Sequence, residues 1–228
     1  MEVEALRKDI TTLKERSHRQ EATVPEARII GLADAHRKKK RCLDLFILLI
    51  TAPLIIPLAI VTAVLIKLDS KGPVFFTQKR VGQLGHTFTM YKFRSMTTDS
   101  EKDGSKFARE NDYRITRLGK FIRKFRIDEI PQFINVLKGD MSVIGPRPEQ
   151  ATFVELFNDE IHQYDLRHMV KPGITGLAQV QHGYVSSKRG TEMKLNYDLF
   201  YIRNYSIKLD LMIIWKTIKT ILTGFGAR

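Results

Sequence analysis

The sequence predicts an α+β protein built on a re-entrant membrane helix hairpin, with amphipathic interfacial helices and a small antiparallel sheet. Three observations predict this fold class. An uncharged apolar run, residues 45–66, is 22 residues long and could cross a hydrocarbon core of about 30 Å. Two short stretches rich in β-branched and aromatic residues follow it. Farther on, apolar residues recur at helical spacing among lysines and arginines in two places.

The composition narrows the choice of partners. At 228 residues the chain is long enough for one well-packed domain with appendages. Its formal net charge of +13 indicates an anionic partner, which could be nucleic acid, acidic lipid headgroups or a polyphosphate substrate. Cys42 is the single cysteine, so an intramolecular disulfide framework and a cysteine-rich zinc site are excluded. This cysteine usage fits a reducing compartment.

Residues 1–36 are predicted to form an N-terminal extension that is partly helical or flexible. Leu6, Ile10 and Leu13 fall at helical spacing among charged residues, which favours a short amphipathic helix. No apolar core follows the first residues, so they do not resemble a signal peptide. Nothing in this stretch indicates catalysis.

Basic residues flank the apolar run on both sides. Residues 37–41 are all lysine or arginine. Four more cations follow the run: Lys67, Lys71, Lys79 and Arg80. Because lysine and arginine mark the side that is not translocated, neither flank is favoured to cross. Pro53 and Pro57 each remove a backbone hydrogen bond and favour a kink. A helix that enters the membrane, bends near Pro53 and returns to the same face satisfies both observations.

The stretch from Pro73 to Met96 is predicted to form the sheet. Strand-forming residues fill 74–77 and 87–91, and two glycines, Gly82 and Gly85, lie between them. If the second strand runs on to Arg94, the side chains of Lys92 and Arg94 share one of its faces. These two cations could grip phosphates or could form an ordinary solvated face.

Residues 114–126 are predicted to form an amphipathic helix. Its apolar positions are Ile115, Leu118, Phe121, Ile122 and Phe125, and its cations are Arg114, Arg117, Lys120, Arg123, Lys124 and Arg126. Such a helix suits the headgroup region of an anionic membrane. It would also suit nucleic acid phosphates, but the sequence contains no motif for recognising RNA or DNA. An apolar segment upstream favours the membrane.

A second amphipathic helix is predicted over residues 209–222. Its apolar face comprises Leu211, Ile214, Trp215, Ile218, Ile221 and Leu222. A tryptophan with flanking lysines suits a membrane interface. The alternative is a helix that closes the soluble core, and the spacing alone does not separate the two.

Two adjacent carboxylates, Asp128 and Glu129, follow the first cationic helix. Carboxylates supply nucleophiles and Mg²⁺ ligands. Nineteen positions after Asp128, Arg147 stands between Pro146 and Pro148, and an arginine fork matches two phosphate oxygens. This combination indicates chemistry on a phosphate ester. The structural alternative is that Asp128 caps a helix, Glu129 lies in its first turn and the Pro-Arg-Pro segment is a stiff turn.

A glycine-containing turn over residues 171–176 follows Arg167. Together with Lys171 it could form a backbone nest for a phosphate, and it could equally be a plain loop. No Gly-x-Gly-x-x-Gly motif follows a predicted strand, so no dinucleotide-binding domain is expected.

Several blocks together resemble the bacterial sugar transferases, the monotopic phosphoglycosyl transferases. In order, the blocks are Lys71-Gly-Pro-Val-Phe-Phe-Thr-Gln-Lys-Arg80, Tyr91-Lys-Phe-Arg-Ser-Met96, Asp128-Glu129-x-Pro-Gln132, Asn135-Val-Leu-Lys-Gly-Asp-Met-Ser142, Gly145-Pro-Arg-Pro148 and Val170-Lys-Pro-Gly-Ile-Thr-Gly-Leu-Ala-Gln-Val180. The likeness covers roughly residues 37–228. Members of this family move a sugar phosphate from a nucleoside-diphosphate sugar onto polyprenyl phosphate. The family also has a re-entrant hairpin broken at a residue–proline pair, here Ala52-Pro53.

The resemblance implies a UDP-sugar and polyprenyl (undecaprenyl) phosphate as substrates, with release of UMP at the start of a cell-surface polysaccharide or glycoconjugate. It implies that Asp128 is the nucleophile and forms a covalent aspartyl intermediate, and that Glu129 binds Mg²⁺. Arg147 would clamp phosphate oxygens, with Lys92 as a second cation. We also assign five further residues to the substrate site: Pro146, Arg80, Arg94, Arg167 and Lys171.

The predicted organisation has three parts: the extension at 1–36, the basic flank and re-entrant helix at 37–68, and a catalytic domain with interfacial helices at 69–228. The expected location is the bacterial inner membrane, with the catalytic domain on its cytoplasmic face. No nucleic acid partner is expected, and the chain could form a homo-oligomer. The alternative is a non-enzymatic, membrane-anchored basic module that binds acidic lipid or nucleic acid and is indifferent to the carboxylate pair.

Overall fold

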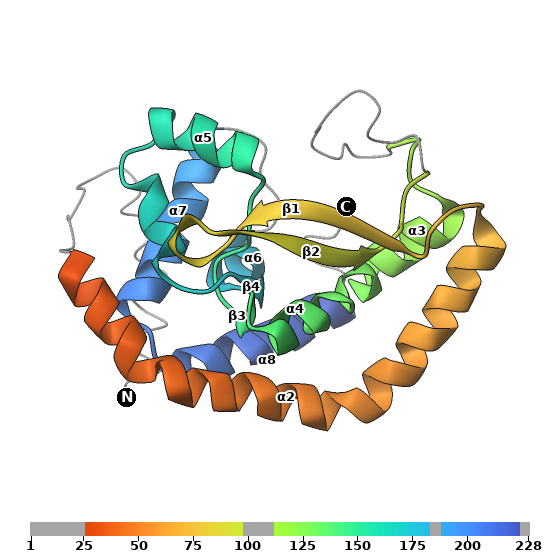
Figure 1. The fold of residues 1–228 in the computed structure, drawn as a ribbon, viewed down its shortest axis with the longest axis horizontal. Helices are drawn as coiled ribbons and strands as arrows, with labels where there is room; N and C mark the ends of the chain where they lie inside the picture. The colour runs from red at the N-terminus through yellow and green to blue at the C-terminus, as the bar shows by residue number, and fades with distance from the viewer. Residues whose placement is uncertain (1–25, 98–111, 183–187, 224–228) are drawn as a thin grey trace.

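The computed structural model describes residues 26–97, 112–182 and 188–223, a mixture of helices and two small sheets (Figure 1). The predicted amphipathic helix over residues 6–13 lies outside these ranges. In chain order the elements are α2 (Glu26–Asp69), β1 (Phe75–Val81), η1 (Gln83–Gly85), β2 (Thr87–Phe93), α3 (Arg117–Lys124), η2 (Ile127–Glu129), α4 (Gln132–Lys138), β3 (Ser142–Ile144), α5 (Ala151–Glu160), η3 (Tyr164–Met169), β4 (Gly173–Thr175), α6 (Leu177–His182), α7 (Lys188–Arg203) and α8 (Ile207–Thr223). The α+β class is confirmed.

The longest element, α2, is helical throughout, with Pro53 and Pro57 inside it. Figure 1 shows α2 passing beneath the globular part, bending near its middle and rising along one side. Just before the prolines, the Thr51 hydroxyl donates to the Ile47 carbonyl at 2.7 Å, a contact that often accompanies a bend. The prolines therefore bend the helix without ending it. The predicted boundary at residue 37 falls inside α2.

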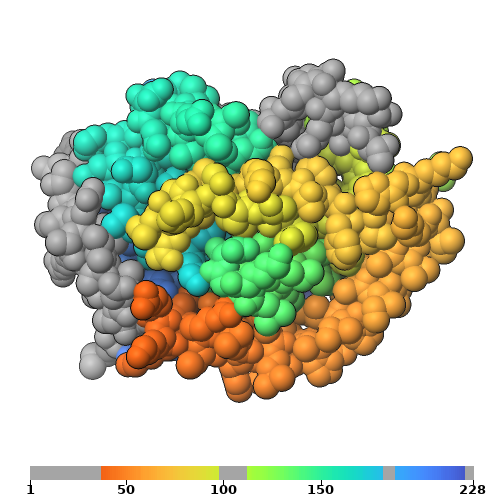
Figure 2. Space-filling model, viewed as in Figure 1, coloured from red at the N-terminus to blue at the C-terminus, as the bar shows by residue number. Residues whose placement is uncertain are grey.

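The apolar stretch of α2 faces outward. Over Arg37–Asp69 its most apolar window has a mean hydropathy of 2.6, and only 11% of that window is buried. Leu49, Leu54 and Leu68 are 73%, 75% and 78% exposed. Figure 2 shows this stretch forming the lower and right-hand rim of the molecule. A core helix of a soluble protein would be mostly buried, so the length, composition and exposure of α2 match a helix that can enter a membrane.

Buried polar contacts attach α2 to the globular part before its apolar stretch begins. Lys40 Nζ lies 2.8 Å from Asp210 Oδ2 of α8. Asp44 Oδ1 accepts hydrogen bonds from Ser142 Oγ at 2.9 Å and from the Val143 amide at 3.0 Å, both on β3. Because a buried charge is tolerated only when it is paired, these contacts fix where the helix lies against the domain.

Arg94 makes a second attachment after the apolar stretch. Its guanidinium donates to acceptors at the C-terminal end of α2, where the last carbonyls lack partners within the helix: Ser70 O (2.7 Å), Ser70 Oγ (2.9 Å), Lys71 O (2.8 Å) and Ile66 O (3.4 Å). Strand β2 ends at Phe93, so the condition under which Arg94 would share a strand face with Lys92 is not met. The side chain caps a helix instead.

Strands β1 and β2 form the predicted antiparallel hairpin, with Phe75 opposite Phe93 and Val81 opposite Thr87. Asn135 of α4 is fully buried and holds this hairpin. Its side-chain amide donates to the Thr89 carbonyl at 2.7 Å and accepts from the Tyr91 amide at 3.1 Å. Strand β2 is thereby fixed against α4.

A second sheet, which the sequence analysis did not predict, pairs β3 and β4 in parallel. Gly145 and Gly173 allow the two chain segments to touch. A Cβ on Gly173 would lie 2.1 Å from the Gly145 nitrogen, and one on Gly145 would lie 2.4 Å from the Lys171 carbonyl oxygen. Both distances are shorter than any real contact, so only glycine fits at this crossing. The crossing fixes where the segment after β3 begins.

Helix α8 packs against the core and also presents an apolar outer face. Leu209 and Ile213 are completely buried, whereas Leu211 and Trp215 are 53% and 71% exposed. The helix therefore closes the core along one side. Its other side remains available for the interface that the sequence pattern suggested.

Candidate active site

The carboxylates Asp128 and Glu129 lie in the 3₁₀ turn η2, directly after the cationic helix α3. Arg126, in the left-handed region at φ 56°, precedes the turn. Both carboxylates are buried, at 7% and 6% exposure. Asp128 caps no helix, because α4 is preceded by Pro131 and has no side-chain cap. The capping alternative is therefore wrong, and the burial of two adjacent acids needs another explanation.

Glu129 is surrounded by cations from separate parts of the chain. Its Oε1 lies 3.1 Å from Lys92 Nζ on β2 and 2.5 Å from Arg147 Nη2 in the segment after β3. Arg126 Nη1 lies 4.0 Å from its Oε2. Burial alone would raise the pKa of Glu129, but the charges of Arg147 and Lys92 outweigh it and hold the pKa well below its usual range. Glu129 is therefore a permanent anion.

Asp128 behaves differently although it is the next residue. Within residues 26–97, 112–182 and 188–223, no group donates a hydrogen bond to its carboxylate. Burial raises the pKa of Asp128 to about 6, against the opposing charge of Lys92 and with the help of the charge on Glu129. Neighbouring carboxylates whose pKa values are pushed apart are typical of catalytic pairs. An anion that lacks hydrogen bonds is also a better nucleophile than a solvated one.

Four cations form a cradle around the two carboxylates: Lys92, Arg123, Arg126 and Arg147. Two cations are therefore in excess, which suits a bound polyphosphate. From the sequence, Arg123 and Arg126 were predicted to be cations of the amphipathic helix and were not assigned to the site. Their proximity to Asp128, five and two residues before it, was the sequence feature that could have assigned them to the site. Helix α3 is shorter than the predicted range of 114–126. It begins at Arg117, after the Thr116 cap, and ends at Lys124, so Arg126 lies beyond its C-terminal end.

The donor set fits Mg²⁺ in one specific way. In the described part of the chain, no group of three or more histidine, cysteine, aspartate or glutamate residues could hold a metal. Mg²⁺ often binds to only one or two carboxylates and completes its shell with substrate phosphates and water. Asp128 and Glu129 supply that minimum, so the residues fit a metal that arrives with a diphosphate.

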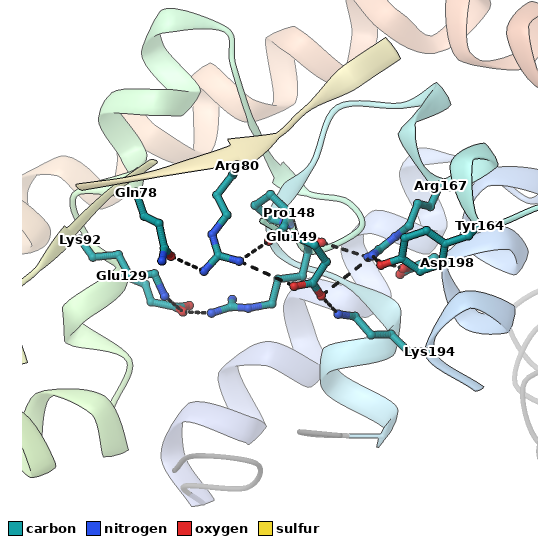
Figure 3. A network of polar contacts seen from close by, with 11 residues as sticks. Gln78, Arg80, Lys92, Glu129, Pro148, Glu149, Tyr164, Arg167, Lys194 and Asp198 are labelled. Atoms are coloured by element: carbon teal, nitrogen blue, oxygen red, sulfur yellow. Dashed lines mark hydrogen bonds and ion pairs between the residues drawn. The ribbon is translucent and has the colours of Figure 1, made fainter. Parts of the chain in front are cut away.

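Arg80 and Arg167, both predicted to bind substrate, lie in a second polar network centred on Glu149 (Figure 3). Arg80 Nη1 lies 3.7 Å from Glu149 Oε2, Arg167 Nη1 lies 3.9 Å from Glu149 Oε1, and Lys194 also pairs with that oxygen. Arg167 further pairs with Asp198 Oδ2 at 2.7 Å. Both arginines are thus already engaged with protein groups. Sequence reasoning missed the acidic members because they lie in no local pattern.

Pro146 and Lys171 take different positions. Pro146 offers its carbonyl to the Gly173 amide at 2.8 Å, so it contributes to the crossing of the two segments. Burial lowers the pKa of Lys171, and the charge of Arg41 adds to the effect. Lys171 therefore lies near the basic start of α2, and no contact joins it to the carboxylate pair among the described residues.

Gln132, the glutamine of the Asp-Glu-x-Pro-Gln block, is an unexpected feature of the site. It is only 1% exposed, and neither atom of its amide has a hydrogen-bond partner within the described ranges. Unpaired buried amides are rare in proteins because each one destabilises the fold. This one begins α4, three positions after Glu129.

Two buried acids of unequal pKa lie among four cations, in a chain that also carries an exposed apolar helix, and this arrangement suits anionic substrates at a membrane. The family model described as bacterial sugar transferase matches residues 35–224, and the chain belongs to that family. The resemblance noted in the sequence is confirmed.

Individual relatives are similar over the same region. The chain is 58% identical over 189 residues to the UDP-N-acetylgalactosamine-undecaprenyl-phosphate N-acetylgalactosaminephosphotransferase of Aeromonas hydrophila, covering 83% of this chain and 45% of that protein. It is 46% identical over 181 residues to the UDP-glucose:undecaprenyl-phosphate glucose-1-phosphate transferase of Klebsiella pneumoniae, covering 78% and 39%. It is 40% identical over 190 residues to the exopolysaccharide production protein PSS of Rhizobium leguminosarum bv. phaseoli, covering 81% and 95%. The chain thus spans less than half of the first two relatives.

Proposed function

We propose that the chain transfers a sugar 1-phosphate from a UDP-sugar to polyprenyl phosphate and releases UMP, thereby starting a cell-surface polysaccharide or glycoconjugate. The observation that carries this proposal is the Asp128–Glu129 pair, buried inside a cradle of four cations in a member of the bacterial sugar transferase family. The names of the relatives, which include both substrates, support it.

The reaction proceeds in two displacements. An oxygen of the Asp128 carboxylate attacks the β-phosphorus of the UDP-sugar, the bond from that phosphorus to the bridging oxygen breaks, and UMP leaves. A phosphate oxygen of the polyprenyl phosphate then attacks the same phosphorus, breaks the acyl phosphate bond and restores the carboxylate. Splitting one transfer into two displacements lets a soluble donor and a lipid acceptor use the site in turn.

Arg147 and Lys92 bind the phosphates. Both contact Glu129 Oε1, at 2.5 and 3.1 Å. A diphosphate brings several more anionic oxygens to the same place, and a planar guanidinium can hold two of them at once. Glu129 and Asp128 would hold Mg²⁺, which when bound neutralises charge on the diphosphate and the leaving group. The cradle therefore serves the substrate charge as well as the carboxylates.

The membrane is where the lipid acceptor is found, and α2 supports a membrane location. Its exposed apolar stretch, the bend around Pro53 and Pro57 and the basic residues at both ends favour a re-entrant helix with both ends on one face. We assign that face to the cytoplasmic side of the bacterial inner membrane, because UDP-sugars are soluble cytoplasmic compounds. The outer face of α8, with Trp215 exposed, would lie at the same interface.

N-acetylgalactosamine is the first sugar to test. The Aeromonas hydrophila relative named for that sugar is 58% identical to this chain, whereas the Klebsiella pneumoniae relative named for glucose is 46% identical. The purified protein is incubated with Mg²⁺, undecaprenyl phosphate and, separately, UDP-N-acetylgalactosamine and UDP-glucose. We expect UMP release and a lipid-linked sugar diphosphate, faster with UDP-N-acetylgalactosamine.

The same preparation separates the two-step reaction from its rivals. Without the lipid, protein and UDP-sugar should give UMP and a protein heavier by one sugar phosphate, and hydroxylamine should release the adduct. Asp128→Asn should form neither adduct nor product. A lipid product made by Asp128→Asn would mean direct transfer between the substrates. If no UDP-sugar yields UMP, and Asp128→Asn binds acidic vesicles as well as the wild type does, the non-enzymatic basic module would be favoured.

A further inference from the structure

All four backbone carbonyl groups of the segment 146–149, which carries Arg147, accept hydrogen bonds. Pro146 and Pro148 have no amide N–H, so two of the four backbone donors of this segment are missing. Instead, four consecutive carbonyls accept hydrogen bonds from distant residues: Pro146 O from Gly173 N (2.8 Å), Arg147 O from Arg167 Nη2 (2.9 Å), Pro148 O from Arg80 Nη1 (3.3 Å) and Glu149 O from Val81 N (2.9 Å). Two of the four donors are arginine side chains.

Arg167 is itself held rigidly. It is 2% exposed, its Nη1 donates to the Tyr164 hydroxyl at 2.6 Å, and its Nη2 donates to Asp198 Oδ2 at 2.7 Å. Its guanidinium also lies over the Tyr164 ring, 5.0 Å from the ring centre. A group with this burial and this set of partners cannot reach a substrate without breaking a buried ion pair. Its contact with the Arg147 carbonyl is therefore its link to the site.

Arg80 reaches the same segment from β1. Besides donating to the Pro148 carbonyl, it donates to Gln78 Oε1 at 2.5 Å and pairs with Glu149. Burial would raise the pKa of Glu149, but the charge of Lys194, followed by that of Arg167, outweighs this effect and lowers it to about 2. The charged carboxylate thus ties Arg80, Arg167 and Lys194 together beside the segment (Figure 3).

We propose that Arg80 and Arg167 are positioning residues, which fix the backbone at Pro148 and Arg147 so that the Arg147 guanidinium stands at the carboxylate pair. They replace the amide donors that the two prolines remove. The inference rests on the proposed function, and it changes the role predicted for these two arginines from binding substrate to holding the residue that does. A misplacement of about 1 Å in such a group lowers turnover on the order of 100-fold.

The test is a double-mutant cycle with Arg147. Arg80→Gln is made in the wild-type protein and in Arg147→Lys. Removing Arg167 alone would leave Asp198 buried and unpaired. Arg167→Gln is therefore combined with Asp198→Asn, so that both charges of the buried pair are removed together. Single-turnover UMP release, with enzyme in excess over the UDP-sugar and at subsaturating enzyme concentrations, measures kcat/KM in slow variants. Calorimetric binding of UDP measures the phosphate contact without turnover.

We expect each change to lower kcat/KM about 100-fold when Arg147 is present and less than about 3-fold in Arg147→Lys, with UDP affinity following the same pattern. Equal losses in both backgrounds would overturn the inference, because direct substrate contacts and general loss of structure both act independently of Arg147. Arg114→Gln is the matched control. The Arg114 guanidinium donates to both carboxylate oxygens of Asp112, and the effect of this substitution should be the same in both backgrounds.

Thermal melting of every variant checks that the fold is kept. A wild-type protein that neither binds UDP nor releases UMP from any UDP-sugar would overturn the proposed function and the inference with it. An active wild-type protein with an additive cycle would overturn the inference alone.

Discussion

Arg147 Nη2 lies 2.5 Å from Glu129 Oε1, although the two residues are 18 positions apart and come from different elements. The contact joins the cationic fork to the acid pair. Lys92 shares the same oxygen. The protein's own charges therefore hold both cations at the acid pair. Such preorganisation reduces the rearrangement needed at the moment of reaction.

Arg147→Lys keeps the positive charge and loses the planar fork. We expect kcat/KM for sugar phosphate transfer to fall roughly 100-fold while the melting temperature stays nearly unchanged, because a single ammonium holds one phosphate oxygen where a guanidinium holds two. Arg117→Lys is the matched control, since Arg117 is exposed at the start of α3. Activity near that of the wild type in the Arg147 variant would mean that Arg147 only shapes the turn.

Asp128→Asn should stabilise the fold at neutral pH. Burial raises the pKa of Asp128 from 3.8 to about 6. The folded state therefore prefers the neutral acid, so the stability that this group contributes is complete below pH 3.8 and is lost as the pH rises through about 6. Asparagine resembles the neutral acid at every pH. The variant should gain roughly 2 kcal/mol at pH 8 and nothing near pH 4.

Urea unfolding of both proteins at several pH values measures this difference. The same titration predicts that wild-type activity falls as the pH drops below about 6, because only the ionised carboxylate attacks phosphorus. Mg²⁺ bound at the pair should shift this fall to lower pH, because a cation favours the ionised form. An Asp128→Asn protein that is less stable at pH 8 would show that the carboxylate is stabilised by a partner in the folded state.

Replacing Pro53 and Pro57 together by leucine should straighten α2. With the bend present, tags at the N-terminus and after residue 228 should both be protected from reagents added outside intact cells. With the bend removed, part of the population should cross the membrane and expose the N-terminal tag, because the leucine helix is apolar and unkinked. Pro73→Ala, outside the helix, is the control. Labelling of the wild-type N-terminus from outside would favour a simple span.

Gln132→Met tests whether the unpaired amide is kept for a ligand. Methionine has a similar length without the polar groups, so we expect the free energy of unfolding to rise by about 1 kcal/mol. We also expect slower UMP release, because the amide begins α4 close in sequence to Glu129 and is available for a bound diphosphate or its water. Unchanged activity would show that Gln132 only packs, and a less stable variant would show that its amide is paired.

The sequence predicted the parts of the site that short motifs and periodicity encode. The β-branched residues of 74–77 and 87–91 predicted the hairpin, and Asp128, Glu129, Lys92 and Arg147 were selected together and do meet. Their chemical roles remain predictions. The pairing of β3 with β4 could not be foreseen, because three-residue strands carry no measurable period.

The roles of the other cations depend on partners far along the chain. Arg94 donates to the backbone at the end of α2, and Arg167 donates to Asp198. No neighbouring residue in the sequence predicts either acceptor. In the sequence, a cation within a family block looks the same whether its partner in the fold is a substrate phosphate or a buried carbonyl group. Only the folded arrangement distinguishes the two.

The attachments of α2 make membrane depth a property of the whole molecule. Lys40 and Asp44 hold the helix before its apolar stretch, and Arg94 holds it after, so the helix cannot tilt by itself. In a bilayer, any change in its slant would carry Asp128 with it. The height at which Asp128, the proposed nucleophile, would meet a lipid phosphate is thus a fixed dimension of the fold, so we expect the reaction rate to depend on membrane thickness.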